Sequence, residues 1–330
     1  FPKRNFMKIW IVTSSNDMLT LFKFLTKYDH EYVVYYDQSH QFYGDQTFEE
    51  SLLNVQSWID YLTKEGVDYI VLPPIFELAI LCHSEWNEES KNNNKKLISF
   101  ANAQDDIKKK ILPLFQTYVM KECFAYSHVG KIGLIGDFAD LQVAEKLLHD
   151  LWASYKITDT QKAIRKFHFP FSRWSKEVPL WKYFLAKLSF SSMMVNRIVK
   201  EDLKYFKDAM VDTLIPLNYG YFNYQNTITK FLNFKKIRFH KLEKIENCFQ
   251  HLAESLRPAS ADKLKAWSYG VKIMYTWHID FLTREKKWMW LLQRGAWTKV
   301  EMLKCGNVEM LKTGKVEKWA KKPKKYTKLI

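Results

Sequence analysis

The feature that most restricts the fold of this 330-residue chain is a helical pattern followed at once by a short apolar run. Between residues 48 and 65 apolar side chains recur at helical spacing, and Gly66 follows where a helix-ending glycine is expected. Residues 67–72 then predict a buried parallel strand, which gives way to a loop at Pro73. In an open α/β sheet, ligands bind just past the carboxyl ends of the strands. Functional residues are therefore expected between Pro73 and Phe76.

The same order of helix, strand and loop occurs again in the second half of the chain. Residues 203–210 have a helical pattern, and the segment from Val211 to Tyr221 passes from an apolar strand into a loop. Elsewhere, strand and helix patterns alternate, which is typical of α/β proteins. The strand patterns cover residues 8–12, 32–36 and 131–135, and the helical ones cover residues 17–28, 75–81 and 141–151. Two similar α/β halves are therefore expected.

These two units resemble the glutamate racemases of the aspartate/glutamate racemase superfamily. That family places one catalytic cysteine in a Cys-Asn-Thr motif after its first such strand, and another in a Gly-Cys-Thr-His-Tyr motif after its second. The positions that match these cysteines are Pro74 and Asn218. Three further segments match in order and spacing, so the resemblance extends from about Met7 to about Cys305. Their matching residues are Thr13 and Ser14, then Asp37, Tyr43 and Gly44, and finally Asp137 and Asp140.

The resemblance implies an α/β fold of two pseudo-symmetric, doubly wound domains with mainly parallel sheets and a crevice between them. The first domain is expected to comprise residues 1–112 and 222–304, the second residues 113–221, and a basic C-terminal tail residues 305–330. From Phe222 onward the chain is expected to rejoin the first domain and to supply two of its strands, at residues 236–239 and 272–275. Pro74 and Asn218 are expected to face each other across the crevice.

The catalytic residues of the family are not preserved. Racemisation by two bases needs a titratable group on each face of the substrate, but proline has none and an asparagine amide is not a base near neutral pH. Thr13 stands in place of the family's thiol-assisting aspartate, and Gly220 stands in place of its histidine. Groups that would hold a substrate carboxylate are replaced by Ile75, Phe76 and Tyr219. The sequence therefore predicts a racemase-like protein that has lost racemase activity.

A crevice remodelled in this way is expected to bind a small acidic or amino-acid-like ligand, or a partner. Its candidate residues are Thr13, Ser14, Asp37, Tyr43, Gly44, Ile75, Phe76, Asp137, Asp140, Asn218 and Tyr219. The alternative is a divergent amino-acid racemase, isomerase or lyase, as in D-glutamate supply for peptidoglycan, with Asp37, Tyr43 or Asp137 in new roles. The histidines lack metal-site spacing and the glycines lack the spacing of a nucleotide-binding loop, so neither a metal nor a cofactor is expected.

The chain carries a formal net charge of +15, and much of the excess lies in one segment. Eight lysines fall between Lys312 and Lys328 against a single acidic residue, Glu317, which predicts a mobile basic extension. A third interpretation is therefore an interaction protein whose tail binds RNA or another polyanion. No apolar run approaches the roughly 20 residues of a membrane span, and the four cysteines form no close pair. A cytoplasmic protein with free thiols and no membrane contact is expected, and a homodimer is left open.

The chain has more tryptophans than glycines, twelve against ten. Three of the tryptophans, Trp10, Trp152 and Trp277, stand where the family has a glycine or where a glycine commonly ends a helix. One explanation is a source that reads the UGA codon as glycine. The other is genuine aromatic richness, which the 23 phenylalanines and 18 tyrosines of the same chain favour.

Overall fold

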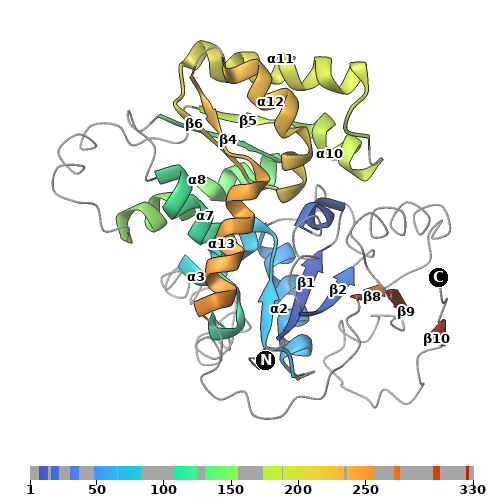
Figure 1. Ribbon diagram of the computed structural model, residues 1–330. Helices are drawn as coiled ribbons and strands as arrows, with labels where there is room; N and C mark the ends of the chain where they lie inside the picture. Colours follow the sequence, from blue (N-terminus) through green and yellow to red (C-terminus); the bar gives the residue numbers. More distant parts are fainter. Residues whose placement is uncertain are drawn as a thin grey trace, which may run out of the picture.

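The computed structural model describes residues 7–13, 16–21, 30–36, 48–64, 66–82, 108–124, 131–154, 174–187, 189–233, 236–255, 271–275, 300–304 and 325–326. Within these ranges the protein consists of two β-sheets with helices packed around them (Figure 1). Figure 1 places the second sheet at the top, beside α11 and α12, and the first sheet below it, beside α2. None of the helices in these ranges is long and apolar enough to cross a membrane.

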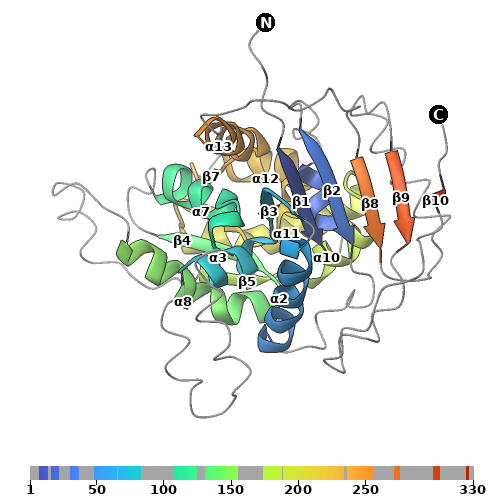
Figure 2. The same cartoon turned by 90° about the horizontal axis from the view of Figure 1, so that it is seen from below.

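The first sheet has the strand order β10-β9-β8-β2-β1-β3. Its strands are β1 (Lys8–Thr13), β2 (Glu31–Tyr36), β3 (Tyr69–Val71), β8 (Val271–Tyr275), β9 (Val300–Lys304) and β10 (Lys325–Tyr326). All neighbours are parallel except β10 and β9, and Figure 2 shows β1, β2, β8 and β9 side by side. Ile11 of β1 lies opposite Val34 of β2 and Val71 of β3, and all three side chains are buried. This burial explains the apolar runs from which the strands were predicted.

The second sheet has the order β5-β4-β6-β7 and is wholly parallel. Its strands are β5 (Ser175–Glu177), β4 (Ile132–Gly136), β6 (Thr213–Pro216) and β7 (Arg238–Phe239). The expectation that residues 236–239 join the first sheet is wrong, because Arg238 and Phe239 pair with Thr213 and Leu214 of β6. The connection from β6 to β7 is short, and short connections keep consecutive strands adjacent. The chain returns to the first sheet only at β8, where residues 272–275 were expected to lie.

Helices pack on both sheets and fill the space between them. Three follow strands of the first sheet: the 3₁₀ helix η1 (Asn16–Leu21), α2 (Phe48–Lys64) and α3 (Pro74–Cys82). A short connection, α7 (Leu114–Tyr118) with the π-helical η4 (Val119–Phe124), leads to the second sheet. Its helices are α8 (Phe138–Ser154), α10 (Pro179–Ala186), α11 (Met193–Ala209), the 3₁₀ helix η6 (Tyr219–Tyr224), α12 (Gln225–Leu232) and α13 (Leu242–Ser255). The two halves meet where α3 packs against α8 and η1 packs against η6.

The helix α2 ends as its sequence predicts. Gly66, just past α2, has a φ of +70°, a left-handed conformation that glycine adopts without strain. Met210 closes α11 in the same region of backbone space, with a φ of +52°. Amphipathic α11 buries Val195, Val199 and Leu203 on the face toward the core. The periodic patterns at residues 48–64, 75–81 and 141–151 all correspond to helices, whereas the pattern at 17–28 is described only as η1.

The structure describes part of the basic tail and two of the three tryptophans that stand at expected glycine positions. Lys325 and Tyr326 form the antiparallel edge strand β10, so this part of the expected mobile extension pairs with a sheet. Trp10 lies buried in β1, and the ring of Trp152 packs edge-on against Phe124 at 4.8 Å. Among the described non-glycine residues only Met210 and Lys236 have positive φ, so the backbone at Trp10 and Trp152 does not require glycine. Trp277 and the remainder of residues 305–330 lie outside the described ranges.

Candidate functional site

Most of the expected crevice residues that the structure describes are packed inside the protein. Thr13 ends β1, Ile75 and Phe76 lie in the first turn of α3, and Asn218 and Tyr219 follow β6; all five are buried. Leu72 and Ile215, which precede the two loops, lie in different halves, since β3 belongs to the first sheet and β6 to the second. Four candidates lie outside the described residues: Ser14, Asp37, Tyr43 and Gly44.

Asn218 has a structural role at the start of η6. It is the N-cap of this helix, and its Oδ1 accepts a hydrogen bond from the Gly220 backbone N–H at 2.7 Å. Gly220 is tightly enclosed, because a Cβ atom built there would lie 2.6 Å from Cδ1 of Leu185 and 2.9 Å from Oδ1 of Asn218. The family's histidine would therefore collide with its neighbours at this position.

Glu77 is a fully buried carboxyl group that the sequence analysis did not single out. From α3 it reaches the start of α7, where Oε2 accepts a hydrogen bond from Phe115 N at 3.0 Å and Oε1 accepts one from Gln116 N at 2.8 Å. Pro113, the residue at the N-cap position of α7, supplies no side-chain acceptor. Glu77 therefore caps α7 in its place, through the two oxygens of its carboxyl group.

Burial raises the pKa of Glu77 to about 8, although the α7 backbone N–H groups and the Tyr219 side chain lower it. Tyr219 also packs edge-on against Phe115, with ring centroids 6.0 Å apart. The loop after β3 and the loop after β6 therefore approach each other through Glu77 and Tyr219. The contact between Pro74 and Asn218 stays a prediction.

A polar cluster lies at the carboxyl edge of the second sheet. Asp137 directly follows β4, and its Oδ2 is 2.7 Å from Nζ of Lys182 on α10, the helix after β5. Tyr221, in η6 after β6, donates its hydroxyl hydrogen to Oδ1 of Asp137 at 3.3 Å. Three adjacent parallel strands thus bring three polar side chains to one point, as expected where α/β proteins bind ligands. Of these, only Asp137 was predicted.

The protonation of Tyr221 follows from its surroundings. Burial raises the pKa of this phenol well above its ordinary value, and the charges of Asp137 and Asp140 raise it further. Tyr221 therefore remains a hydrogen-bond donor at physiological pH. Asp140, in the first turn of α8, is half-buried and belongs to the electrostatic surroundings of the cluster.

Large apolar side chains lie exposed at the same edge of the sheet. Phe138 begins α8 next to Asp137, and Leu180 and Tyr183 flank Lys182 on α10, with 60%, 48% and 55% of their surfaces exposed. Single exposed apolar residues are common on protein surfaces, but several of them together beside polar groups can contact a ligand or partner. The edge therefore offers an ion pair that can engage charged groups, together with apolar surface for the rest of a small molecule.

Two thiols whose side chains the structure describes, those of Cys123 and Cys248, offer no replacement base. Cys123 and Cys248 are free and buried, and burial raises the pKa of both, to about 11 for Cys248. Both are therefore protonated near neutral pH, unlike reactive cysteines. Within the described ranges, no group of three or more histidine, cysteine, aspartate or glutamate residues could hold a metal ion.

Comparison with solved structures finds that the chain is similar to glutamate racemases. No family model and no curated protein sequence matches it. Glutamate racemase RacE1 from Bacillus anthracis matches with a TM-score of 0.59 at 16% identity, over 90% of this chain and 97% of that one. The Thermus thermophilus glutamate racemase matches with a TM-score of 0.57 at 14% identity, over 88% and 93% of the two chains. The Aquifex pyrophilus glutamate racemase matches with a TM-score of 0.54 at 19% identity, over 89% of this chain and 98% of that one. This chain has the two-domain fold of the glutamate racemases.

Proposed function

We propose that this protein has the glutamate racemase fold without the racemase reaction, and that it binds a small acidic or amino-acid-like ligand between its two halves. The proposed absence of the racemase reaction is supported by the packing around Gly220. The side chain of Asn218 is committed to capping η6, and the space beside Gly220 is filled by Leu185. A thiol and an imidazole at these positions would need a different local packing.

The ligand-binding part of the proposal is supported by the Asp137 and Lys182 ion pair. Both side chains are partly exposed, at 19% and 31%, and both lie at the edge of the sheet that is used for ligands in open α/β folds. A carboxylate can bind Lys182 and an ammonium group can bind Asp137. The exposed rings of Phe138 and Tyr183 would contact the remainder of the ligand.

The first test is exchange of the α-hydrogen of glutamate and aspartate in D₂O. Losing one positioned proton-transfer group typically lowers a rate by about 10² to 10⁴, so the loss of both should leave no measurable exchange into either enantiomer. A known glutamate racemase is the positive control, and boiled protein sets the background. Exchange above that background would contradict the proposal and favour the isomerase alternative.

Restoring two cysteines provides a stricter form of the same test. The variant Pro74→Cys with Asn218→Cys should remain inactive, because it removes the cap of η6 and still lacks room for an imidazole at position 220. Circular dichroism must first establish that this variant is folded. Racemisation by the folded variant would mean that the thiols alone were missing.

The second test concerns the ligand. A ligand at about 100 times its Kd stabilises a protein by about 2.7 kcal/mol, so thermal unfolding with D- and L-glutamate, D- and L-aspartate and apolar amino acids should identify binding. Lys182→Ala should abolish the stabilisation. Lys146→Ala, an exposed lysine on α8, should retain it and serves as the matched control. Equal stabilisation of both variants would place the ligand elsewhere.

A further inference from the structure

The outer face of α11 carries a row of basic side chains. Arg197, Lys200, Lys204 and Lys207 follow one another at intervals of three or four residues, so they lie on one stripe of the helix. The first three are exposed, and Lys207 lies over the ring of Phe231 on α12 at 5.6 Å. At 1.5 Å per residue the row is about 15 Å long. We call these four residues the basic stripe.

A hollow lies at the N-terminal end of the basic stripe. It has a volume of about 510 Å³ and is lined by Ser191, Met193, Asn196, Arg197, Lys200 and Glu201. Neither Arg197 nor Lys200 forms a close ion pair with a residue in the described ranges, although the charge of Arg197 helps to lower the pKa of Glu201, so both can bind an anion there. The volume is within the range of small-molecule sites, roughly 300 to 1,000 Å³.

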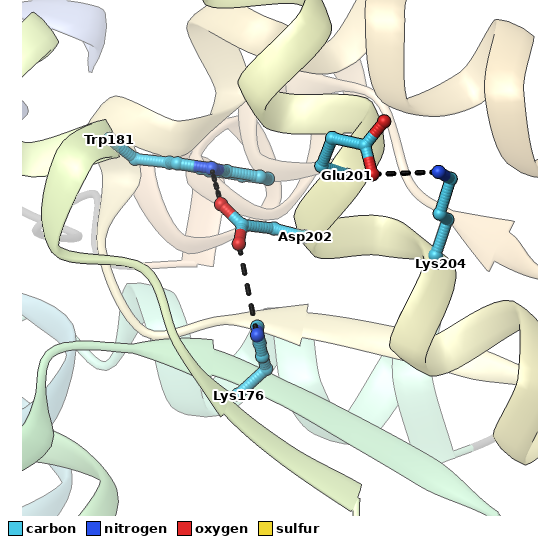
Figure 3. Close-up of polar contacts among 5 residues, drawn as sticks. All are labelled: Lys176, Trp181, Glu201, Asp202 and Lys204. Carbon is cyan, nitrogen blue, oxygen red and sulfur yellow. Dashed lines mark hydrogen bonds and ion pairs between the residues drawn. The ribbon is translucent and has the colours of Figure 1, made fainter.

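Two acidic residues of α11 lie next to each other in sequence and have different roles (Figure 3). Asp202 points inward, where Oδ2 accepts a hydrogen bond from Nε1 of Trp181 at 2.8 Å. Glu201 lies on the outer face, with Oε2 2.7 Å from Nζ of Lys204. Glu201 therefore competes with an external anion for Lys204 of the basic stripe, and exposed Asp208, four residues after Lys204, adds a second carboxylate to this face.

We propose that the basic stripe and the hollow bind the phosphodiester backbone of a single-stranded nucleic acid. A single straight row of cations suits one strand, and an excess of positive charge over the whole chain, +15, favours a polyanion. The Ser191 side chain adds an uncharged polar group beside Arg197 and Lys200, whereas the Asn196 amide is hydrogen-bonded to Thr227 and to the Ser191 carbonyl. Binding by these groups is directed at the backbone and is independent of base sequence.

A lipid surface fits this face less well. Amphipathic helices that bind membranes insert their apolar side, whereas the apolar side of α11 is buried in the protein through Val195, Val199, Leu203 and Phe206. Among the exposed apolar residues that the structure describes on α11, Met193 lies in line with the basic stripe, whereas Met194 and Tyr205 lie to one side of it. The charges of the face are therefore available, but an apolar side for insertion is not.

The test uses the full chain and a fluorescently labelled twelve-nucleotide oligouridylate, titrated at several salt concentrations. The double variant Arg197→Glu with Lys200→Glu should weaken binding at least about tenfold and reduce the slope of log K against log salt by about 1.4, since each lost contact contributes about 0.7. The matched control, Lys146→Glu with Lys241→Glu, changes the net charge equally at exposed positions outside the stripe and should weaken binding less than about threefold. Oligothymidylate in place of oligouridylate tells whether RNA or DNA is preferred.

The variant Glu201→Gln should have the opposite effect on oligonucleotide binding. It removes the competing carboxylate, so it should strengthen binding by about threefold and steepen the salt dependence. Arg197→Gln with Lys200→Gln repeats the loss without new negative charge, in case the double glutamate variant is unfolded. Equal weakening by the stripe and control variants would assign binding to the lysine-rich tail or to net charge and overturn the proposal. Absence of oligonucleotide binding, or stripe-dependent binding only to phosphatidylserine vesicles, would overturn it as well.

Discussion

At the scale of single residues, Glu77 shows how the fold uses a charge-bearing group for structure. Its two oxygens accept hydrogen bonds from backbone N–H groups at the start of α7, which Pro113 leaves without a side-chain cap. Burial disfavours the charged form of Glu77 more than these backbone donors favour it, so its pKa is raised to about 8. Glu77 is therefore a stability determinant that depends on pH.

The direction of that dependence follows from the pKa. The folded value of about 8 is above the ordinary value of 4.5, so the folded protein holds the proton more tightly than the unfolded chain does. This contribution to stability is complete below pH 4.5 and is lost as the pH rises to about 8.

Glu77→Gln, which does not titrate, isolates the effect. The free energy of unfolding of the natural protein minus that of the variant should fall as the pH rises, by at most about 1.4 kcal/mol per pH unit. Urea unfolding of both proteins between pH 5 and pH 8 measures the difference. A difference that stays constant over this range would mean that Glu77 is already ionised at pH 5.

At the scale of elements, α11 is held to the second sheet by Asp202. This residue accepts a hydrogen bond from the indole of buried Trp181 and lies 3.8 Å from Lys176 of β5 (Figure 3). Burial raises the pKa of Asp202, while the indole and Lys176 lower it. One carboxylate thus joins α11 to α10 and to the edge of the sheet.

Replacing Asp202 should loosen this helix. Asp202→Ala leaves the buried indole N–H of Trp181 without its acceptor, which costs about 1 to 3 kcal/mol. Glu201→Ala is the matched control one position earlier, and its exposed pair with Lys204 should contribute less than about 1 kcal/mol. Chemical unfolding monitored by tryptophan fluorescence compares the two. Equal losses would show that Trp181 has another acceptor.

At the scale of the whole molecule, the two halves are joined by a contact between residues far apart in the chain. Nδ2 of Asn223 in η6 donates to Oγ1 of Thr20 in η1 at 2.6 Å and to the Gly220 carbonyl at 2.9 Å. These two helices follow β1 and β6 respectively, so the bond spans the interface between the halves. It adds a polar link to the packing of η1 against η6.

A double-mutant cycle of Thr20→Val and Asn223→Ala should measure this bond. Each change alone should destabilise the protein by about 1 kcal/mol, and the two together by less than their sum, because both remove the same interaction. Urea unfolding curves of the four proteins provide the values. Strict additivity would mean that the bond contributes nothing to joining the halves.

The sequence predicted the fold better than the site. Buried parallel strands and amphipathic helices leave periodic patterns, so β1, β2, β6, α2 and α8 were found close to their bounds. Sheet membership has no such local pattern, and β7 was assigned to the wrong sheet for this reason. The cluster of Asp137, Lys182 and Tyr221 depends on three strands meeting at one edge, which no local spacing encodes. Glu77 sits in an apolar helical segment, and its buried partners are 38 and 39 residues away.

The order in which the strands enter the first sheet matters during synthesis. β2 is synthesised early, but one of its two partners is β8. β8 leaves the ribosome only after all strands of the second sheet have been synthesised. The second sheet is contiguous from Ile132 to Phe239 and can close as soon as β7 emerges. The growing chain therefore completes its later half first, while the open edge of β2 is exposed to pairing with other chains. A nascent protein of this fold should depend on chaperones until β8 has been added and covers β2.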